Sequence, residues 1–373
     1  MRLDHFRRLR PHCPVCAAAC RAAAREPAPL ALGEVALAAG DDIIEGVLVC
    51  SERLCQREHP IVDGIPIVVA DIASWSAHQL PALLRRDDLT PFTESLIGDA
   101  AGPQSEFHAE RSNLGIYGWA HWGDRAGDRA GDGAGDGAGA DAAQRHGGAY
   151  LGLLEACWPL QGAPVQGAWI DLGCAAGRGT VELARRGAEI AVGVDLGFAM
   201  LRVAERVRRT GRARFALRRG GLVFDRCDFA VPDVPAERIA YWCCDVAALP
   251  FADAAFGGAL LLNVVDCVPA PLALLAETGR VLGRGAAALY ASPYDWSPQA
   301  TPVSQWLGGV GQRGPARGSS AAELRRILSA DRAAGVDLGL VIESELDAVP
   351  WHLRTGDRSA MEYAVHAARL RRR

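Results

Sequence analysis

The second half of the chain alternates short apolar runs with segments in which apolar residues recur every three or four positions. Segments of the second kind, such as 180–187 and 199–209, end in arginine or glycine, as helices commonly do. The alternation is typical of βαβ units, so it predicts an open, doubly wound α/β domain around a mostly parallel sheet. The predicted strands are 169–174, 191–196, 239–246, 257–265 and 286–292.

A stretch of glycine, aspartate and alanine interrupts the chain at residues 123–148, with almost nothing large and apolar to bury. Such a composition predicts a flexible linker. A chain of 373 residues is long enough for two domains. We therefore predict a small domain at 1–75, a connecting region at 76–122 and a second domain at 149–373.

The charge balance argues against two classes of partner. A net charge of -4 gives no general attraction to nucleic acid or to anionic lipid. The basic N-terminus is not followed by an apolar stretch, and no uncharged apolar run reaches the ~18 residues that span a bilayer. We expect a soluble, cytoplasmic protein without membrane contacts, in which clustered cysteines are metal ligands or buried thiols.

Two close pairs of cysteines lie near the N-terminus, one in CPVC and one in GVLVCSERLC. Pairs separated by about thirty residues can bring four thiolates around one structural zinc, in a domain too small to hold together without it. Free buried thiols are the alternative. Cys20, His12 and His59 are further donors nearby, which we expect to be unligated surface residues. The predicted ligands are Cys13, Cys16, Cys50 and Cys55.

These motifs, followed by HPIVDGIPIVV, resemble the small zinc-binding domain of the methyltransferase-activator proteins and their short bacterial relatives. The usual pattern has two residues between the later cysteines, where this chain has four. It also has Tyr-Pro where this chain has His59 and Pro60. The resemblance implies a zinc-ribbon-like domain and, since that domain accompanies methyltransferases, a methyltransferase in the rest of the chain.

A glycine-containing loop, IDLGCAAGRGT at 170–180, lies where a predicted strand gives way to a helix. Such a loop lets a ligand approach the backbone, and Asp195, about twenty residues on, can bind ribose hydroxyls. A dinucleotide is compatible with the loop. S-adenosylmethionine is favoured because Asp171 would repel a pyrophosphate, Ala175 replaces the middle glycine, and Asp245 precedes an apolar turn that suits an adenine ring.

Residues 149–370 resemble class I S-adenosylmethionine-dependent methyltransferases, which implies a Rossmann-like sheet of seven strands. The resemblance also implies that Asp195 binds the ribose, Asp245 and the backbone of Val246 bind the adenine, and Asn263 lies beside the methyl-bearing sulfur. A fold that binds the cofactor without catalysis is the alternative. The residues expected to line the methionine part are Asp171, Gly173, Ala175 and Gly177.

The acceptor side is less distinctive. The segment after the fourth strand reads NVVDCV rather than the NPPY type, which disfavours exocyclic base amines and glutamine amides as acceptors. Tyr294, Asp295, Trp296 and Trp306 follow the fifth strand at the edge where ligands of α/β folds bind, and they could form an aromatic cage with an acid. The predicted catalytic residues are Tyr294, Asp295 and His352.

Each candidate base has a structural alternative. Asp266 is a further candidate, although we favour a helix-capping role for it. Asp295 could form a turn, and His352 could be a strand residue that faces solvent.

The segments at 263–282 and 292–309 resemble the methyltransferase domain of ovothiol synthesis, which methylates a ring nitrogen of a mercapto-histidine. The likeness extends to the glycine loop and to VPWHLR near the C-terminus, whereas the iron-dependent sulfoxide-forming portion has no counterpart in this chain. The resemblance implies a small polar substrate, heterocyclic or amino-acid-like, rather than ovothiol itself.

Two other functions remain open. The first is an RNA methyltransferase, since some ribosomal RNA guanine methyltransferases also carry a four-cysteine domain ahead of this fold. RNA could be contacted by the basic stretches at 8–12, 206–220 and 369–373, although we favour the interpretation that these stretches are solvated surface. A non-catalytic adaptor could dock a protein partner through its zinc domain. The aromatic segment 115–124 is either a lid over the cofactor or a packing element.

Overall fold

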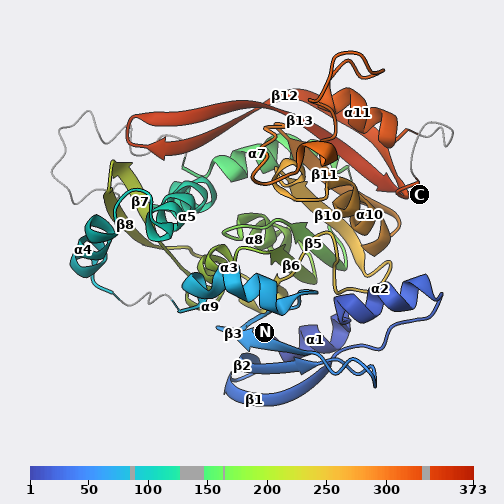
Figure 1. Ribbon diagram of the computed structural model, residues 1–373, viewed down its shortest axis with the longest axis horizontal. Coiled ribbons are helices and arrows are strands. Elements are labelled where there is room, and N and C mark those ends of the chain that lie inside the picture. The colour runs from blue at the N-terminus through green and yellow to red at the C-terminus, as the bar shows by residue number, and fades with distance from the viewer. Residues whose placement is uncertain (85–88, 127–146, 163, 330–336) are drawn as a thin grey trace.

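The computed structural model describes residues 1–84, 89–126, 147–162, 164–329 and 337–373 (Figure 1). Most of the predicted linker at 123–148 lies outside these residues. A mixed sheet of seven strands forms the centre of the molecule, in the order β12-β13-β11-β10-β5-β6-β9. Its strands are β5 (Ala168–Leu172), β6 (Ile190–Asp195), β9 (Ile239–Cys243), β10 (Phe256–Leu262), β11 (Leu282–Ser292), β12 (Leu340–Gly356) and β13 (Ser359–Arg372).

The five strands predicted from the apolar runs are confirmed, and they pair in parallel. The long β12–β13 hairpin joins them through antiparallel pairing of β13 with β11. The predicted α/β class is therefore confirmed. Because side chains alternate between the faces of a strand, neighbouring residues such as Trp169 and Ile170 enter separate cores on the two faces.

Helices cover one face of the sheet, where the core combines Trp169 and Tyr241 with Trp119, Leu153 and Phe198. The helices that supply this core are α5 (Glu106–Trp122), α7 (Ala149–Cys157), α8 (Arg178–Arg185) and α9 (Phe198–Thr210).

The opposite face is covered partly by α10 (Pro271–Val281) and α11 (Ser320–Ile327), and partly by the N-terminal region. Phe6, Leu9 and Leu48 share a core with Trp242 and Phe251. The connection from β9 to β10 contains no helix, and the N-terminal region covers the sheet there.

The N-terminal region consists of two helices and a four-stranded antiparallel sheet below the central sheet in Figure 1. Backbone bonds fasten it to the larger sheet: His12 N–H donates to the Pro250 carbonyl (2.6 Å), and Val68 N–H donates to the Cys243 carbonyl (2.8 Å). The elements are α1 (Leu3–Leu9), α2 (Pro14–Ala22), β1 (Ala31–Ala39), β2 (Asp42–Val49), β3 (Glu58–Val62) and β4 (Ile65–Pro66).

The connecting region forms α3 (Ile72–Leu84), α4 (Pro91–Ala101) and α5, and α5 packs against the hairpin of β7 (Arg212–Gly220) and β8 (Val223–Ala230). A Cβ on Gly118 would lie 2.6 Å from the ring of Phe215, so only glycine allows this approach. Single-turn 3₁₀ helices lie at Gly123–Arg125, Trp158–Leu160, Ala236–Arg238, Val265–Cys267 and Val303–Gln305.

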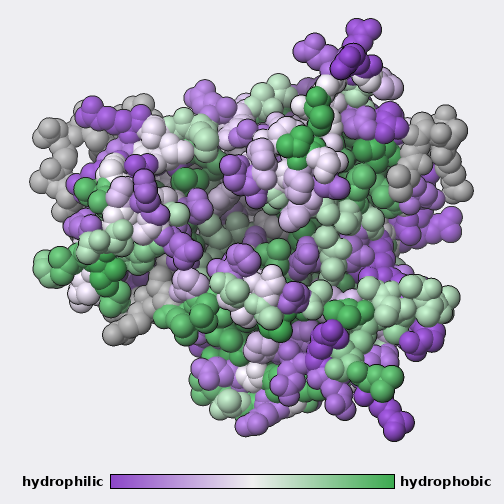
Figure 2. All heavy atoms as spheres, in the orientation of Figure 1, coloured by the Kyte–Doolittle hydropathy of each residue, from purple (hydrophilic) through white to green (hydrophobic). Residues whose placement is uncertain are grey.

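Figure 2 shows hydrophobic residues gathered over α3 and α4. Phe92 and Leu84 are the most exposed of the apolar side chains on these two helices. None of the helices in the described ranges is long and apolar enough to cross a membrane.

Candidate functional site

The glycine loop between β5 and α8 has an unusual backbone conformation. Gly173, Ala175 and Gly177 all have positive φ angles, of 72°, 43° and 86°. A Cβ on Gly173 would lie 2.5 Å from Cγ2 of Val264, and one on Gly177 would lie 2.5 Å from the hydroxyl of Tyr241. The loop is therefore packed closely on one side, and substitutions at these glycines would displace it.

The C-terminal end of α5 supports this loop from below. Trp122 Nε1–H donates to the Ala176 carbonyl (2.8 Å), and the backbone N–H of Arg178 donates to His121 Nδ1 (3.0 Å). Burial, followed by the charge of Arg178, lowers the pKa of His121 to about 3, so the ring is a neutral acceptor. These residues of the aromatic segment thus pack against the glycine loop.

Tyr117 of the same helix lies at the site itself. Asp195, the last residue of β6, and Asp266, which follows β10, act electrostatically on its hydroxyl, as does Tyr363 of β13. Burial is the main cause that raises the pKa of Tyr117. The aromatic segment therefore combines one side chain at the site with several that hold the loop.

Asp171 is buried beneath the loop, where the hydroxyl of Thr180 donates to Oδ2 (2.8 Å). Burial raises the pKa of this carboxyl group to about 7. A Cβ on Gly179 would lie 2.6 Å from Oδ2, so α8 begins directly against the carboxylate. In this structure Asp171 ties β5 to α8.

Asp195 joins the two loops that follow β5 and β6. Its Oδ2 accepts from Ala175 N–H (3.0 Å), and its Oδ1 accepts from Gly197 N–H (2.8 Å). Helix α3 supports the same turn, because Trp75 Nε1–H donates to the Leu196 carbonyl (3.2 Å). The connecting region is therefore part of the wall behind the predicted ribose site.

The predicted adenine turn follows β9. Asp245 Oδ1 accepts from Ala247 N–H (2.8 Å), which fixes the turn, while Val246 is buried in the core with Leu249 and Phe251.

Asn263 at the end of β10 has the most unusual environment of the predicted residues. Its φ angle is 56°, and its N–H donates to the Ala291 carbonyl (2.8 Å). Both the oxygen and the nitrogen of its side-chain amide are buried and have no hydrogen-bond partner within the described part of the chain. A buried amide without partners costs about 1–3 kcal/mol, so this side chain is placed to meet a ligand.

A relay of polar side chains lies beside the end of β11. The Tyr294 hydroxyl is 2.7 Å from His366 Nδ1, and His366 Nε2 is 3.0 Å from Glu345 Oε1. The sequence reasoning did not identify His366 or Glu345. Both lie on the β12–β13 hairpin, far along the chain from Tyr294 and outside any short motif. The rings of Tyr294, Trp296 and Trp306 stack in a row, with centroids 6.4 and 6.1 Å apart.

Asp295 is exposed and is positioned by two neighbours. Its N–H donates to Asp266 Oδ2 (2.7 Å), and the Tyr363 hydroxyl donates to its Oδ2 (2.9 Å). The expectation that Asp266 caps a helix is wrong, because Ala270 is the N-cap of α10 and the Asp266 side chain holds the Asp295 turn. Tyr363 was also missed from the sequence.

The structure does not bring His352 to Asp295. It lies on β12 opposite Glu362, and its side chain, 37% exposed, has Nδ1 3.7 Å from Glu362 Oε1. Strand alternation directs it to the face of the hairpin opposite Trp351 and Tyr363.

The four predicted zinc ligands do come together. All their sulfur atoms lie within 4.8 Å of one another. Cys13 Sγ is 3.9 Å from Cys55 Sγ, and Cys16 Sγ is 3.6 Å from Cys50 Sγ. Four thiolates around zinc at ~2.3 Å lie about 3.8 Å apart, so the donors fit a closed tetrahedral site.

The nearby donors are not part of this cluster, as expected. However, the expectation that they lie on the surface is wrong, because Cys20, His12 and His59 are all buried.

Residues 170–290 match the family model of a methyltransferase domain. No curated protein sequence matches the chain. Residues 170–290 therefore form a domain of the methyltransferase type.

Solved structures with similar backbones have low identity to this chain. A phosphoethanolamine N-methyltransferase 2 from Haemonchus contortus, in complex with S-adenosyl-L-methionine, is 20% identical over 39% of this chain, with a TM-score of 0.30. This chain spans only 28% of its length.

An S-adenosylmethionine-dependent methyltransferase from Methanosarcina mazei is 20% identical over 55% of this chain and 92% of its own, with a TM-score of 0.37. A putative one from Listeria monocytogenes is 13% identical over 60% and 99%, with a TM-score of 0.37.

Proposed function

We propose that this protein transfers the methyl group of S-adenosylmethionine to a small polar acceptor, heterocyclic or amino-acid-like, bound between Asn263 and Tyr294. The observation that carries the proposal is the Asn263 amide, which is buried and unsatisfied at the edge of the sheet where the cofactor loop and the acceptor residues meet. A bound ligand would supply the missing partners.

On the cofactor side, the residues have the required hydrogen-bonding capacity. Asp195 accepts one backbone bond at each oxygen, and each carboxylate oxygen can accept a second, so ribose hydroxyls can still donate to it. Asp245 and the Val246 backbone hold the adenine, and the backbone of the glycine loop holds the methionine part. When bound, the cofactor supplies a methyl group on a sulfonium, which is already activated for displacement.

On the acceptor side, we assign two tasks. Asp295, fixed by Tyr363, binds a cationic or N–H group of the acceptor and so orients it toward Asn263. The Tyr294 hydroxyl receives the acceptor's proton while its own proton passes to His366 Nδ1, and Glu345 stabilises the resulting imidazolium. Tyr117 lies between the cofactor side and the acceptor side, where it closes the site and excludes water.

We also propose that the four-cysteine cluster binds zinc in a structural role. Four thiolates complete the coordination of the metal, so no position is left for a substrate. The zinc then stabilises the N-terminal sheet that covers the central sheet.

The test is incubation of the metal-loaded protein and a host extract with cofactor that carries a labelled methyl group, followed by separation of small molecules, protein and RNA. Label should appear in the small-molecule fraction and should be lost with the Tyr294→Phe variant. Label confined to RNA or protein would overturn the proposed substrate class. Calorimetry provides a second check, since folded protein that gives no heat with S-adenosylmethionine would be an adaptor and not an enzyme.

A further inference from the structure

The acceptor side of the proposed site contains two carboxylates that no arginine balances. Asp266 follows β10 and Asp295 follows β11, so both lie at the edge of the sheet from which the glycine loop also emerges. Asp295 N–H donates to Asp266 Oδ2 (2.7 Å), which brings the two segments together. Among the described residues, neither carboxylate forms an ion pair with an arginine.

Asp266 has the more unusual environment of the two. Only 2% of its surface is exposed, and its Oδ1 is buried without a hydrogen-bond partner in the described part of the chain. Burial raises the pKa of this carboxyl group. Since buried carboxylates are ordinarily paired with a cation or with hydrogen-bond donors, the unsatisfied oxygen marks a place for a donor that comes from a ligand.

Two tyrosines border the same place. Tyr117 of α5 and Tyr363 of β13 both lie within reach of the Asp266 charge, and the Tyr363 hydroxyl donates to Asp295 Oδ2 (2.9 Å). Burial, followed by the hydrogen bond to Asp295, raises the pKa of Tyr363 to about 12. The charged groups that act most strongly on both tyrosines and on Asp266 are all acidic, so this side of the site has a negative potential.

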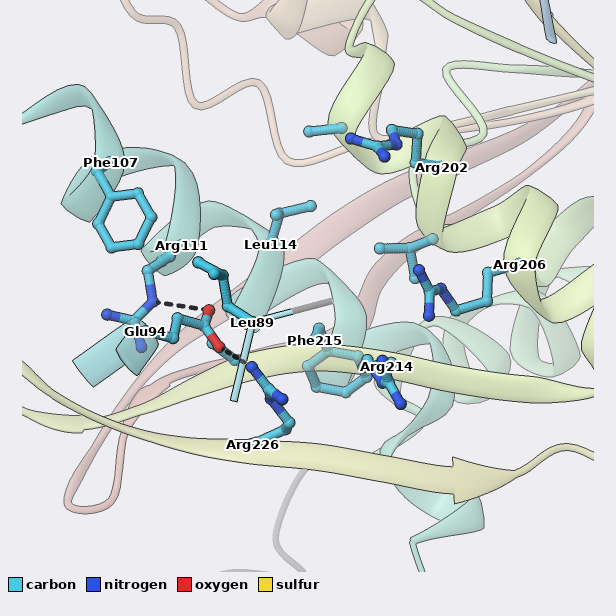
Figure 3. A pocket seen from close by; sticks show the side chains of 13 residues that line it. Leu89, Glu94, Phe107, Arg111, Leu114, Arg202, Arg206, Arg214, Phe215 and Arg226 are labelled. Atoms are coloured by element: carbon cyan, nitrogen blue, oxygen red, sulfur yellow. Dashed lines mark hydrogen bonds and ion pairs between the residues drawn. The ribbon is translucent and has the colours of Figure 1, made fainter. Parts of the chain in front are cut away.

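The arginines of the molecule are engaged elsewhere. Figure 3 shows several of them in a cleft beside α5, where Arg111 and Arg226 both point to Glu94. None of the residues assigned to the acceptor lines that cleft. Arg325 reaches the polar relay beside β11, but there it pairs with Glu345 (3.0 Å). Within the described part of the chain, this leaves a bound cation as the partner of the two aspartates.

We propose that the acceptor carries a protonated amino group in addition to the atom that is methylated, and that Asp266 and Asp295 bind this ammonium. The inference rests on the function proposed above and narrows its substrate class. An ammonium group presents several donors around a compact charge, so it can bond to carboxylates that come from separate segments. The Tyr363 ring, stacked on Trp351 with centroids 5.3 Å apart, adds the kind of aromatic wall that favours cations.

The two parts of such an acceptor have different tasks. A protonated amine has no lone pair, so the group held by the aspartates is not the nucleophile. A second atom is methylated, and its proton passes to Tyr294 as described above. Because two carboxylates bind the ammonium, it needs at least two N–H groups. The substrate class is therefore a small primary or secondary amine with a separate accepting atom, whereas neutral heterocycles and anionic molecules are excluded.

The test extends the labelling experiment with host extract. The labelled small molecule is separated by electrophoresis at low pH, where carboxyl groups are neutral, before and after acetic anhydride converts amines to amides. It should lose positive charge, and mass spectrometry should place the methyl and acetyl groups on different atoms. Unchanged mobility, or both groups on one nitrogen, would overturn this inference and leave the proposed function standing. Absence of label from the small molecules would overturn both.

Asp266→Asn removes the charge and keeps an oxygen that can accept from Asp295 N–H. It should raise the extract concentration needed for half-maximal labelling about tenfold or more, because a charge-assisted hydrogen bond to the acceptor is lost. Asp225→Asn is the matched control. Asp225 lies on β8 and bonds to Arg219 outside the site, so this variant loses the same charge and should label as the wild type does. Labelling by Asp266→Asn at the wild-type concentration would contradict the proposal.

A cofactor titration shows which cation Asp266 faces. Asp266→Asn should bind S-adenosylmethionine and S-adenosylhomocysteine with wild-type affinities in calorimetry, which also establishes that the variant is folded. If the carboxylate instead faced the sulfonium, the variant would lose affinity for S-adenosylmethionine alone, since S-adenosylhomocysteine lacks that charge. Such a selective loss would overturn the assignment of Asp266 to the acceptor.

Discussion

The two halves of the proposed site, for the cofactor and for the acceptor, are built by different means. In the cofactor half, Asp195 and Asp245 accept hydrogen bonds from backbone N–H groups, and glycines fix the path of the loop. In the acceptor half, side chains position one another, as in the contact of Tyr294 with His366 and that of Tyr363 with Asp295. The cofactor half should therefore be sensitive to backbone changes, and the acceptor half to the loss of single polar atoms.

The largest effect should come from Gly177→Ala. A Cβ there would lie 2.5 Å from the Tyr241 hydroxyl and 2.6 Å from Ala204 Cβ, at a φ angle of 86°. We expect a loss of cofactor affinity of 100-fold or more, roughly 3 kcal/mol, together with lower stability. Gly152→Ala in α7 is the control, because nothing lies within 4 Å of that position. Equal affinities in calorimetry would show that the loop is not rigid.

Tyr294→Phe should slow methyl transfer by about 10²–10⁴-fold, because it removes the hydroxyl that receives the proton. Cofactor affinity should not change, since Tyr294 belongs to the acceptor half. Tyr363→Phe should mainly raise KM for the acceptor, because it only frees Asp295. Single-turnover rates and cofactor titrations on the same samples distinguish the two. A joint loss of cofactor affinity would contradict the division into halves.

Removal of zinc by a chelator, or the double variant Cys50→Ser/Cys55→Ser, should unfold the N-terminal sheet and weaken cofactor binding about tenfold. The adenine turn loses its cover there, since His12 N–H donates to the Pro250 carbonyl. Metal content and cofactor affinity are the measurements. Cys20→Ser is the control, because Cys20 lies outside the cluster. Full affinity in metal-free protein would mean that the two domains fold independently.

Asn263→Ala should weaken cofactor binding by roughly tenfold and yet raise the stability of the ligand-free protein by about 1 kcal/mol. The reason is that the variant removes a buried amide without partners. Thermal unfolding with and without cofactor measures both effects. A lower melting temperature of the ligand-free variant would argue against an unsatisfied side chain.

A pH-dependent effect is expected at Asp171. Burial raises its pKa to about 7 in the folded protein, so its contribution to stability is full below pH about 4 and is lost as pH rises toward 7. Asp171→Asn keeps an acceptor for Thr180 but cannot ionise. The difference in melting temperature between variant and wild type should therefore shift in favour of the variant as pH rises from 4 to 7. A constant difference would show that Asp171 does not titrate in this range.

The sequence marks the glycine loop and the cysteine cluster more clearly than the residues around Tyr294, and the difference in construction explains why. A loop held by backbone contacts needs glycines at fixed positions, so it can be identified from a short motif such as DLGCAAGRGT. The cysteine cluster is likewise recorded by paired spacing. The five parallel strands are buried on both faces and therefore stand out as continuous apolar runs.

No short sequence motif marks the residues of the acceptor half. His366 reaches Tyr294 across 72 residues through the register of β13 with β11. That register is a property of the folded sheet, so no local pattern marks His366. The position of His352 likewise depends on strand register. Neighbouring residues of β12 face opposite sides of the hairpin, so His352 lies on the face opposite to that of Trp351. The alternatives for the aromatic segment 115–124 stayed open for the same reason, because it contacts the glycine loop, the start of α8 and β7, all more than fifty residues away.

The connection from β9 to β10 contains no helix, and this has a consequence for folding during protein synthesis. The N-terminal sheet covers the gap, but the surface that it covers is completed only at Phe251, about 180 residues after Val69 leaves the ribosome. At a synthesis rate of ~5–20 residues per second, roughly 10–40 s pass between completion of the N-terminal sheet and completion of the surface that it covers. During that interval the proposed zinc would hold the N-terminal sheet folded. Cells short of zinc should then accumulate nascent chains that aggregate before the second domain is made.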